Sequence, residues 1–219
     1  MKLYLIRHGE TEWNRAHRFQ GRIDIPLNEA GRDLARITRE RMPQVDYDRV
    51  YVSPLGRAIE TAHLLLDGRF PSDQFRIDPR VIEICFGDWE GTDIDAAGKD
   101  SSHPLYNCLW HPENYFPKQY DPDSCAESFQ ELIDRADDFL RNEILPLEKE
   151  VGNILVVAHG ALIRAVVAAA GFLDIPNFWN NRYLNCCLTT IGITEGKITL
   201  EKEAEIFYDP ENYVKGWKK

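Results

Sequence analysis

Two short apolar runs of the sequence end in the same way, in a histidine that is followed by a glycine. Leu3–Ile6 leads to His8, and Asn153–Ala158 leads directly to His159. Short apolar runs ended by glycine or polar residues are typical of buried parallel strands. Ligands of open α/β sheets bind beyond the carboxyl ends of the strands. Either histidine alone fits a hydrogen-bonded core residue, but the repeated setting favours two imidazoles that face one another across a crevice.

The rest of the chain alternates between strand-like and helix-like patterns. The other expected strands are 49–52 and a hairpin of 187–194 and 197–205, and the expected helices are 28–41, 53–66, 124–147 and 161–170. We expect Ser53 to be the N-cap of the second helix, with Pro54 in its first turn. Ser124 and Glu127 have the spacing of a capping box and are expected to begin the third helix.

This alternation predicts an α/β fold, a three-layer sandwich with a mostly parallel central sheet flanked by helices. Residues 93–123 break the pattern and are rich in proline, aspartate and aromatic side chains. Because linkers rarely carry so many aromatic residues, we interpret this stretch as an inserted cap over the edge of the sheet. The 219 residues are then expected to form a single domain with one cap insertion.

The composition bears on partners and on compartment. The formal net charge of −10 makes nucleic acid and anionic membranes poor partners. The five cysteines form no recognisable disulfide framework, and Cys186 and Cys187 would point to opposite faces of a strand, so we expect free thiols in a reducing compartment. The first apolar run is too short for a signal peptide or a membrane span. We therefore expect a cytoplasmic monomer or homodimer without membrane contact.

Two arginines stand where an anion site beyond the strand ends could use them. Arg7 adjoins His8, and Arg57 falls in the first turn of the second expected helix. Cations are mildly disfavoured at a helix N-terminus, so an arginine there is more easily explained by an anion in front of it. The alternative for Arg57 is a surface position, paired with Glu60 or Glu10.

Glu83 is the one carboxylate with a suggestive setting. It is flanked by apolar residues, which favour the protonated carboxyl that a general acid needs. The alternative is a strand residue that faces solvent. The sequence alone leaves both interpretations open.

Ordered blocks of the chain carry a family resemblance. The blocks are 5–11 (LIRHGET), 19–27 (FQGRIDIPL), 53–62 (SPLGRAIETA), 83–91 (EICFGDWEG) and 156–160 (VVAHG). This set resembles the histidine phosphatase superfamily, which includes the cofactor-dependent phosphoglycerate mutases. One block would be weak evidence, but all of them occur in the family's order and span residues 2–195.

The resemblance implies a role for each matching residue. His8 would be the nucleophile that forms a phosphohistidine, and Glu83 would be the general acid and base. Positive groups would bind the phosphoryl oxygens, and these are Arg7, Arg57 and His159. The other implied substrate-binding residues are Asn14, Gln20, Gly21 and Gly160. We expect no metal and no cofactor, because these positive groups take the place of a metal and no EF-hand, HExxH or Walker-type spacing is present.

Within the superfamily the sequence favours a phosphatase over a mutase. Mutases that it resembles carry arginine and aromatic residues just after the acid, but here Glu83 is followed by Ile84, Cys85 and Phe86. Residues 88–150 hold five basic and sixteen acidic side chains, which suits a phosphoglycerate poorly. We expect hydrolysis of a small phosphate monoester. The alternatives are phosphoglycerate mutase activity and a non-catalytic module that binds a phosphorylated ligand.

The charge is unevenly distributed along the chain. Residues 1–60 hold 11 basic and 9 acidic side chains, so the acidic excess lies later, mostly in 88–150. The total charge therefore does not preclude a local phosphate site. An acidic cap should favour substrates with neutral or cationic leaving groups. The cap aromatics, Trp110, Tyr115 and Phe116 among them, either contact such a group or pack the cap onto the sheet.

Overall fold

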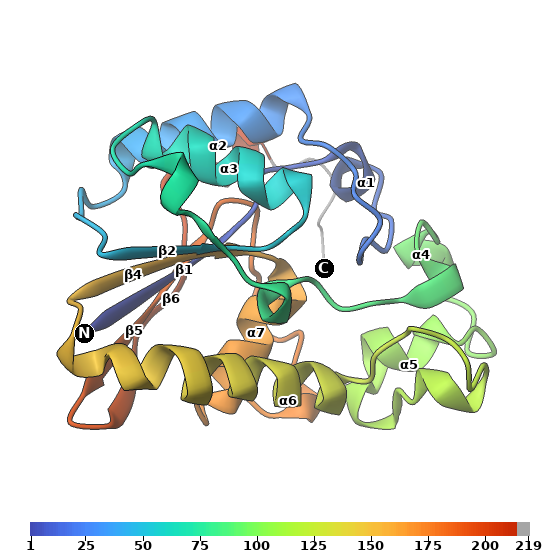
Figure 1. Cartoon of the computed structure of the whole chain (residues 1–219). Helices are drawn as coiled ribbons and strands as arrows, with labels where there is room; N and C mark the ends of the chain where they lie inside the picture. Colours follow the sequence, from blue (N-terminus) through green and yellow to red (C-terminus); the bar gives the residue numbers. More distant parts are fainter. Residues whose placement is uncertain (214–219) are drawn as a thin grey trace.

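One open sheet of six strands runs through the protein between two layers of helices (Figure 1). The computed structural model describes the backbone of residues 1–213 and the side chains of residues 1–211. The strands are β1 (Lys2–Arg7), β2 (Arg49–Val52), β3 (Arg76–Ile77), β4 (Asn153–Ala158), β5 (Leu188–Thr194) and β6 (Lys197–Glu205). The helices are α1 (Glu12–Arg15), α2 (Glu29–Arg41), α3 (Gly56–Leu66), α4 (Ile94–Ala97), α5 (Leu105–Trp110), α6 (Phe129–Phe139), α7 (Gly160–Ala169) and α8 (Pro210–Tyr213).

The sheet has the order β3-β2-β4-β1-β5-β6, and its first four strands in that order are parallel. Strand β5 is antiparallel to both of its neighbours, β1 and β6, and is the one strand of this sheet that runs in the opposite direction. The predicted fold class, a mostly parallel α/β sandwich, is confirmed. The short edge strand β3 was not expected, because two exposed residues carry no apolar pattern.

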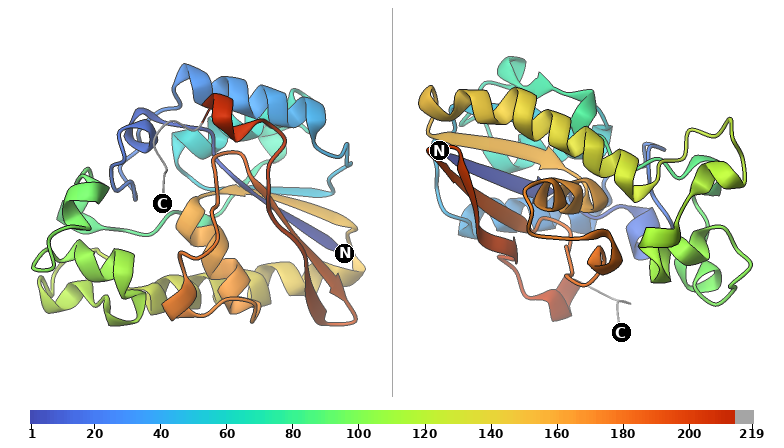
Figure 2. Two further views of the ribbon diagram at one scale, coloured as in Figure 1. Left: turned by 180° about the vertical axis from the view of Figure 1, so that it is seen from behind. Right: turned by 90° about the horizontal axis from the view of Figure 1, so that it is seen from below.

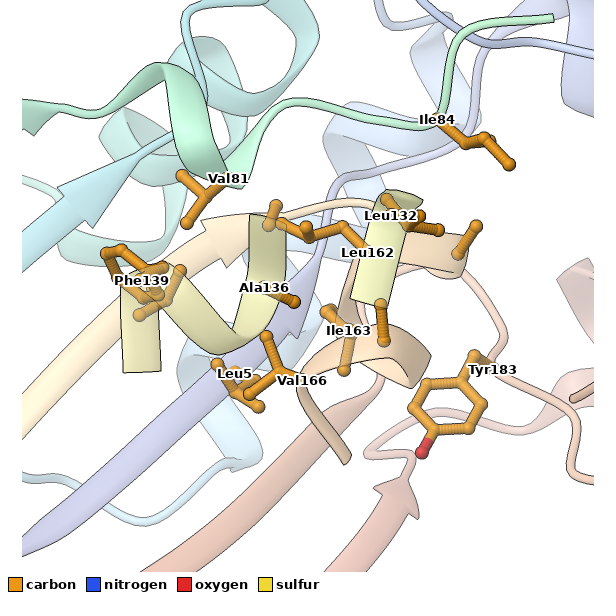
Figure 3. Packing of buried hydrophobic residues seen from close by; sticks show 14 of the residues in the cluster. Leu5, Val81, Ile84, Leu132, Ala136, Phe139, Leu162, Ile163, Val166 and Tyr183 are labelled. Carbon is orange, nitrogen blue, oxygen red and sulfur yellow. The ribbon is translucent and has the colours of Figure 1, made fainter. Parts of the chain in front are cut away.

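Alternate residues of the central strands supply the two halves of the core. Leu5 and Val156 face α6 and α7, whereas Ile6 and Val157 pack with the buried side of α3. Figure 3 shows the first of these halves, where Leu5 meets apolar residues of both helices. Because both faces of the sheet are covered, these strands read as continuous apolar runs.

Two expected helix starts are wrong, and tertiary contacts explain both. The helix after β2 begins at Gly56 with Leu55 as N-cap, not at Ser53. The N–H of Gly56 donates instead to the carboxylate of Asp24, at 2.7 Å, so a distant loop supplies the cap. Ser53 uses its hydroxyl for another contact, described below. Sequence spacing cannot distinguish a local cap from one supplied by a residue far away in the chain.

The capping box of the next long helix is shifted by one turn. Ser128 and Glu131 form it, and α6 begins at Phe129 rather than near Ser124. Glu127 is recruited elsewhere, because its carboxylate accepts from the backbone N–H of Cys85 and pairs with Arg135. Beyond α6 the chain continues as a π-helical turn, Leu140–Ile144, and a 3-10 turn, Leu145–Lys149.

Residues 93–123 contain α4 and α5 and lie beside the carboxyl ends of the parallel strands (Figures 1 and 2). Their aromatic side chains divide into two groups. Tyr115 is buried and packs against Phe129 of α6, whereas Trp110, Phe116 and Tyr120 are exposed. Tyr115 therefore packs this segment onto α6, and Tyr120, although exposed, makes an edge-to-face contact with Trp89.

The expected hairpin is confirmed as β5 and β6. Glu195 and Gly196 join the strands and both have positive φ, as a two-residue hairpin turn of type I′ requires. Cys186 and Cys187 precede β5 instead of lying within a strand, and Cys186 itself has a φ of 57°. All five cysteines are free thiols, and of these only Cys125 is exposed.

Candidate active site

His8 and His159 follow the carboxyl ends of two adjacent parallel strands. The last residue of β1, Arg7, lies level with the last residue of β4, Ala158. Both rings are buried, and their centroids lie 5.1 Å apart. The predicted juxtaposition of the two imidazoles is therefore present in the fold.

The ring of His8 is fixed by its own loop. Its Nδ1 lies 2.6 Å from the carbonyl oxygen of Gly9, which also accepts from the amide of Asn185. Because a carbonyl can only accept, Nδ1 carries the proton, and a neutral ring has its lone pair on Nε2. Burial and the guanidiniums of Arg57 and Arg7 lower the pKa of His8 well below its ordinary value, so the neutral form prevails.

Glycine is needed beside this histidine because the backbone of α2 comes very close. A Cβ on Gly9 would lie only 2.6 Å from the carbonyl oxygen of Gly31. Gly9 also donates its N–H to the hydroxyl of Thr61 on α3. The loop that carries His8 is thus held by both helices on that face of the sheet.

His159 makes a different contact. Its Nε2 lies 2.6 Å from the hydroxyl oxygen of Ser53, which follows the end of β2. Its Nδ1 is buried and has no hydrogen-bond partner in the described structure. Burial, the guanidinium of Arg57 and the ring of His8 lower the pKa of His159 well below its ordinary value. This ring is also neutral.

Arg7 and Arg57 are held by backbone carbonyls and not by carboxylates at hydrogen-bond distance. Arg7 donates to the carbonyl of Tyr183 at 2.5 Å. Arg57 donates to the carbonyls of Gly21 and Ile23 at 2.6 and 2.9 Å. The Nε atoms of both arginines are buried without a partner in the described residues. Each guanidinium is thus fixed along one edge and keeps an unused donor.

The surface alternative for Arg57 is wrong, because its side chain is fully buried. Glu60 pairs with Arg32 instead, and Glu10 pairs with Arg15. Burial lowers the pKa of Arg57 to about 10, which leaves the guanidinium charged at neutral pH. The expectation that a bound anion lies in front of the start of α3 needs correction, because the carboxylate of Asp24 lies there. One of its oxygens accepts from the N–H of Gly56, and the other lies 3.8 Å from Arg57.

Glu83 sits at the N-terminus of α7 and does not face solvent. Its carboxylate accepts from the N–H groups of Ala161, Leu162 and Ile84 at 3.2, 3.0 and 3.0 Å. The side chain is 7% exposed. Unpaired N–H groups at a helix start are well suited to a carboxylate, so the start of α7 fixes the orientation of this group.

The other predicted binding residues lie around this centre in supporting contacts. Asn14 accepts from Thr11 and from Asn185, and Gln20 accepts from the hydroxyl of Thr11. The carbonyls of Gly21 and Gly160 accept from Arg57 and Arg164 respectively. The expected donation from the backbone around Gly160 is partly redirected, because the next two N–H groups bind Glu83.

Arg164 is a site residue that the sequence analysis missed. It lies on α7, is 7% exposed, and donates to the carbonyls of Gly160 and Asn181. Its Nε is buried without a partner in the described structure. The available signal was a single charged residue within the otherwise apolar run 161–170. Ser53 and Asn185 were missed as well, because each acts through contacts far along the chain.

The arrangement can bind a tetrahedral oxyanion. Buried nitrogen atoms without a partner in the described structure remain on Arg7, Arg57, Arg164 and His159, and the rings of His8 and His159 lie side by side at the strand ends. The three guanidiniums supply positive charge for such an anion, and Glu83 together with Asp24, which lies 3.8 Å from Arg57, offsets part of it. In residues 1–211 no three His, Cys, Asp or Glu side chains are grouped as metal ligands would be.

Comparison with known proteins identifies the family. The sequence pattern of the Histidine phosphatase superfamily (branch 1) matches residues 3–205. The chain belongs to this superfamily. The resemblance inferred from the sequence blocks is thereby confirmed, and the protein is a phosphoric monoester hydrolase of the histidine phosphatase type.

Relatives of this histidine phosphatase cover almost its whole length. The uncharacterized phosphatase PhoE of Bacillus subtilis is 33% identical, over 88% of this chain and 89% of its own. The adenosylcobalamin/alpha-ribazole phosphatase of Salmonella typhimurium is 32% identical, over 92% and 95%. The solved structure of Bacillus stearothermophilus YhfR superposes with a TM-score of 0.80 at 30% identity, over 94% and 97%. Within the described part of the chain, no helix has the length and apolar character of a membrane span.

Proposed function

We propose that this histidine phosphatase hydrolyses small phosphate monoesters through a phosphohistidine on His8, with Glu83 as general acid and base and without a metal ion. The observation that carries the proposal is the contact between Nδ1 of His8 and the carbonyl oxygen of Gly9, at 2.6 Å. The Nδ1–H of His8 is bound by this carbonyl, so the nucleophilic lone pair is on Nε2 and lies beside unused donors.

In the first step, Nε2 of His8 attacks phosphorus in line with the ester oxygen. The N–P bond forms as the P–O ester bond breaks, and Glu83 gives its proton to the departing oxygen. Arg7, Arg57 and the Nδ1–H of His159 bind the other phosphoryl oxygens. They supply fixed positive charge where negative charge accumulates, which is the role a metal ion has in other phosphatases.

In the second step, water replaces the histidine. Glu83, now ionised, takes a proton from a water molecule as its oxygen attacks phosphorus. The N–P bond breaks, inorganic phosphate leaves, and His8 regains its lone pair. The carboxyl is again protonated, so the cycle closes without a further reactant.

Hydrolysis is favoured over mutase activity by the charges near the site. Of the two lysines in residues 93–123, Lys118 is paired with Glu131. A mutase has to retain an anionic phosphoglycerate through two transfers, and a paired lysine offers it little. Two of the relatives named above, those of Bacillus subtilis and Salmonella typhimurium, carry phosphatase names, whereas a 30% identical protein of Photorhabdus laumondii is named a probable phosphoglycerate mutase, so the charges carry the choice.

The test is turnover of p-nitrophenyl phosphate in EDTA by the full chain and by two variants. His8→Ala should lose turnover and should not show the mass gain of one phosphoryl group that the wild type shows when the reaction is quenched with denaturant at alkaline pH, where the N–P bond is stable. His63→Ala, an exposed histidine on α3, is the matched control and should behave as wild type. Turnover that persists in His8→Ala would refute the nucleophile assignment.

The mutase alternative has its own assay. Conversion of 3-phosphoglycerate to 2-phosphoglycerate is followed with 2,3-bisphosphoglycerate present. Conversion faster than hydrolysis of any monoester in a panel of phosphorylated metabolites would replace the proposal. The absence of turnover on every member of the panel would favour a non-catalytic binding module.

A further inference from the structure

Ser53 occupies an unusual place for a residue that resembles a helix cap. Its backbone N–H continues the parallel ladder by donating to the carbonyl of Val157, at 3.0 Å. This register places Ser53 beside the end of β4, and its hydroxyl oxygen lies 2.6 Å from Nε2 of His159. Both side chains are completely buried. The contact is therefore shielded from competition by bulk water.

The hydrogen-bond inventory of Ser53 favours one direction for this contact. The hydroxyl oxygen also accepts, from the backbone N–H of Leu55 at 3.4 Å. A hydroxyl has one proton to give, and of its hydrogen-bond partners in the described structure the ring nitrogen of His159 is the one that can accept it. If the hydroxyl donates to Nε2, the proton of the neutral ring must be on Nδ1, the atom without a partner.

The reverse direction would leave two groups unsatisfied. The hydroxyl proton of Ser53 would have no acceptor among its contacts, and the buried Nδ1 of His159 would carry a lone pair, so that the ring could not donate to a phosphoryl oxygen. A lone pair repels phosphoryl oxygens, whereas an N–H binds them. The groups that act electrostatically on this ring, namely Arg57, His8, Arg7 and Arg135, all disfavour a second proton on it.

We propose that Ser53 is a positioning residue that selects the Nδ1–H tautomer of His159. The two active-site histidines are then held in different ways: Gly9 leaves His8 a lone pair on Nε2 for attack, and Ser53 leaves His159 an N–H for binding. This inference rests on the proposed function for its catalytic consequence. The tautomer itself can be measured independently of turnover.

Nitrogen-15 NMR of the histidine-labelled full chain tests the tautomer directly. Long-range nitrogen–proton spectra distinguish a protonated from an unprotonated ring nitrogen, and the His159→Asn variant assigns the signal. We expect a protonated Nδ1 and an unprotonated Nε2 on His159. A protonated Nε2 in the wild-type protein would overturn the inference, even if His8→Ala had already established the phosphohistidine mechanism.

A double-mutant cycle tests the catalytic consequence. Ser53→Ala should lower kcat by about tenfold to a hundredfold, the usual effect of losing a partner that orients a catalytic imidazole. In a His159→Ala background the same substitution should have no further effect on kcat, because there is no ring to orient. If the fold losses in kcat of the two single variants multiply in the double variant, Ser53 only supports the strand end, and the positioning role is refuted.

Two further variants separate hydroxyl chemistry from packing. Ser53→Thr retains the hydroxyl and should recover most of the kcat that Ser53→Ala loses. Thr38→Val removes another completely buried hydroxyl, on α2, and should leave kcat unchanged. Equal kcat for Ser53→Ala and wild type would contradict the proposal, provided that the His8→Ala control has lost activity.

Discussion

The guanidinium of Arg164 lies over the ring of Tyr183, 4.3 Å from its centroid, and the backbone carbonyl of Tyr183 binds Arg7. Arg164 therefore stabilises the segment that fixes Arg7, for which we propose phosphate binding. It also donates to the carbonyl of Asn181 in the same segment. A cation stacked on an aromatic ring and bridging two carbonyls needs the planar fork of arginine.

We accordingly expect Arg164→Lys to impair both folding and catalysis. Lysine keeps the charge but cannot satisfy both carbonyls, so the free energy of unfolding should fall by about 1–3 kcal/mol. Because the segment that binds Arg7 is then held less firmly, kcat/KM should fall by about tenfold. Denaturant titration and steady-state kinetics measure the two effects. Arg141→Lys, an exposed arginine on the same side of the sheet, is the control; a stability loss without a kinetic effect would limit Arg164 to a structural role.

Replacement of the acid should depend on the leaving group. Glu83→Gln should lower kcat by about 10²- to 10⁴-fold for an alkyl phosphate, because the departing alkoxide needs a proton. The loss in the first step should be much smaller for p-nitrophenyl phosphate, whose leaving group is stable as an anion. Burst kinetics separate the two steps. Glu60→Gln serves as control, and equal losses for both substrates would speak against general-acid catalysis.

The two buried histidines should make stability depend on pH. Their pKa values are lowered in the folded protein, so below about pH 6.5 the unfolded chain binds protons that the folded chain does not. Stability is then fully present above this pH and decreases as the pH falls toward the folded-state values. Two rings contribute a slope of about 2.7 kcal/mol per pH unit.

Urea titrations between pH 5 and 7 measure this slope. Each of His8→Asn and His159→Asn should reduce this slope by about 1.4 kcal/mol per pH unit. Each variant removes one of the two protons that the unfolded chain binds in excess of the folded chain. The experiment uses a phosphate-free buffer, because a bound oxyanion would itself shift the equilibrium. A slope that is unchanged in both variants would contradict the assignment of two neutral buried rings.

An oxyanion should stabilise the fold through the unused donors. At a concentration about a hundredfold above its dissociation constant, orthovanadate or phosphate should add about 2.7 kcal/mol to the free energy of unfolding. Arg57→Lys should abolish most of this gain, because the compact ammonium of lysine cannot reproduce the planar guanidinium that binds both carbonyls and leaves Nε free for the anion. Thermal unfolding with and without the anion measures the effect. A gain retained in Arg57→Lys would place the anion elsewhere.

The acidic cap should influence which esters are preferred. At low ionic strength, substrates with neutral or cationic leaving groups should have higher kcat/KM than bisphosphates, and added salt should narrow the difference. Matched sugar monophosphates and bisphosphates provide the comparison. If the bisphosphates had the highest kcat/KM values of the panel, the expectation would be contradicted.

Sequence patterns predicted the features that depend on residues close together in the chain, such as the strands. The apolar runs before His8 and His159 identified two parallel strands, and the edge of the sheet where both side chains emerge followed from strand direction. The helix starts at 53 and 124 were wrong for a common reason. Ser53 and Glu127 look like local caps, but His159 and the pair of Cys85 and Arg135 compete for their polar atoms.

By itself the sequence determined the family and most of the strand–helix order, without β3, and it predicted the candidate site residues Arg7, His8, Arg57, Glu83 and His159. Only the tertiary structure decided how these groups are oriented. The carbonyls of Gly21, Ile23 and Tyr183 select which guanidinium edges stay unused, and Gly9 and Ser53 contact opposite types of ring nitrogen on the two histidines. Such backbone and hydroxyl contacts are available to any sequence, so they leave no residue pattern to read, and the folded chain alone brings them within hydrogen-bond distance.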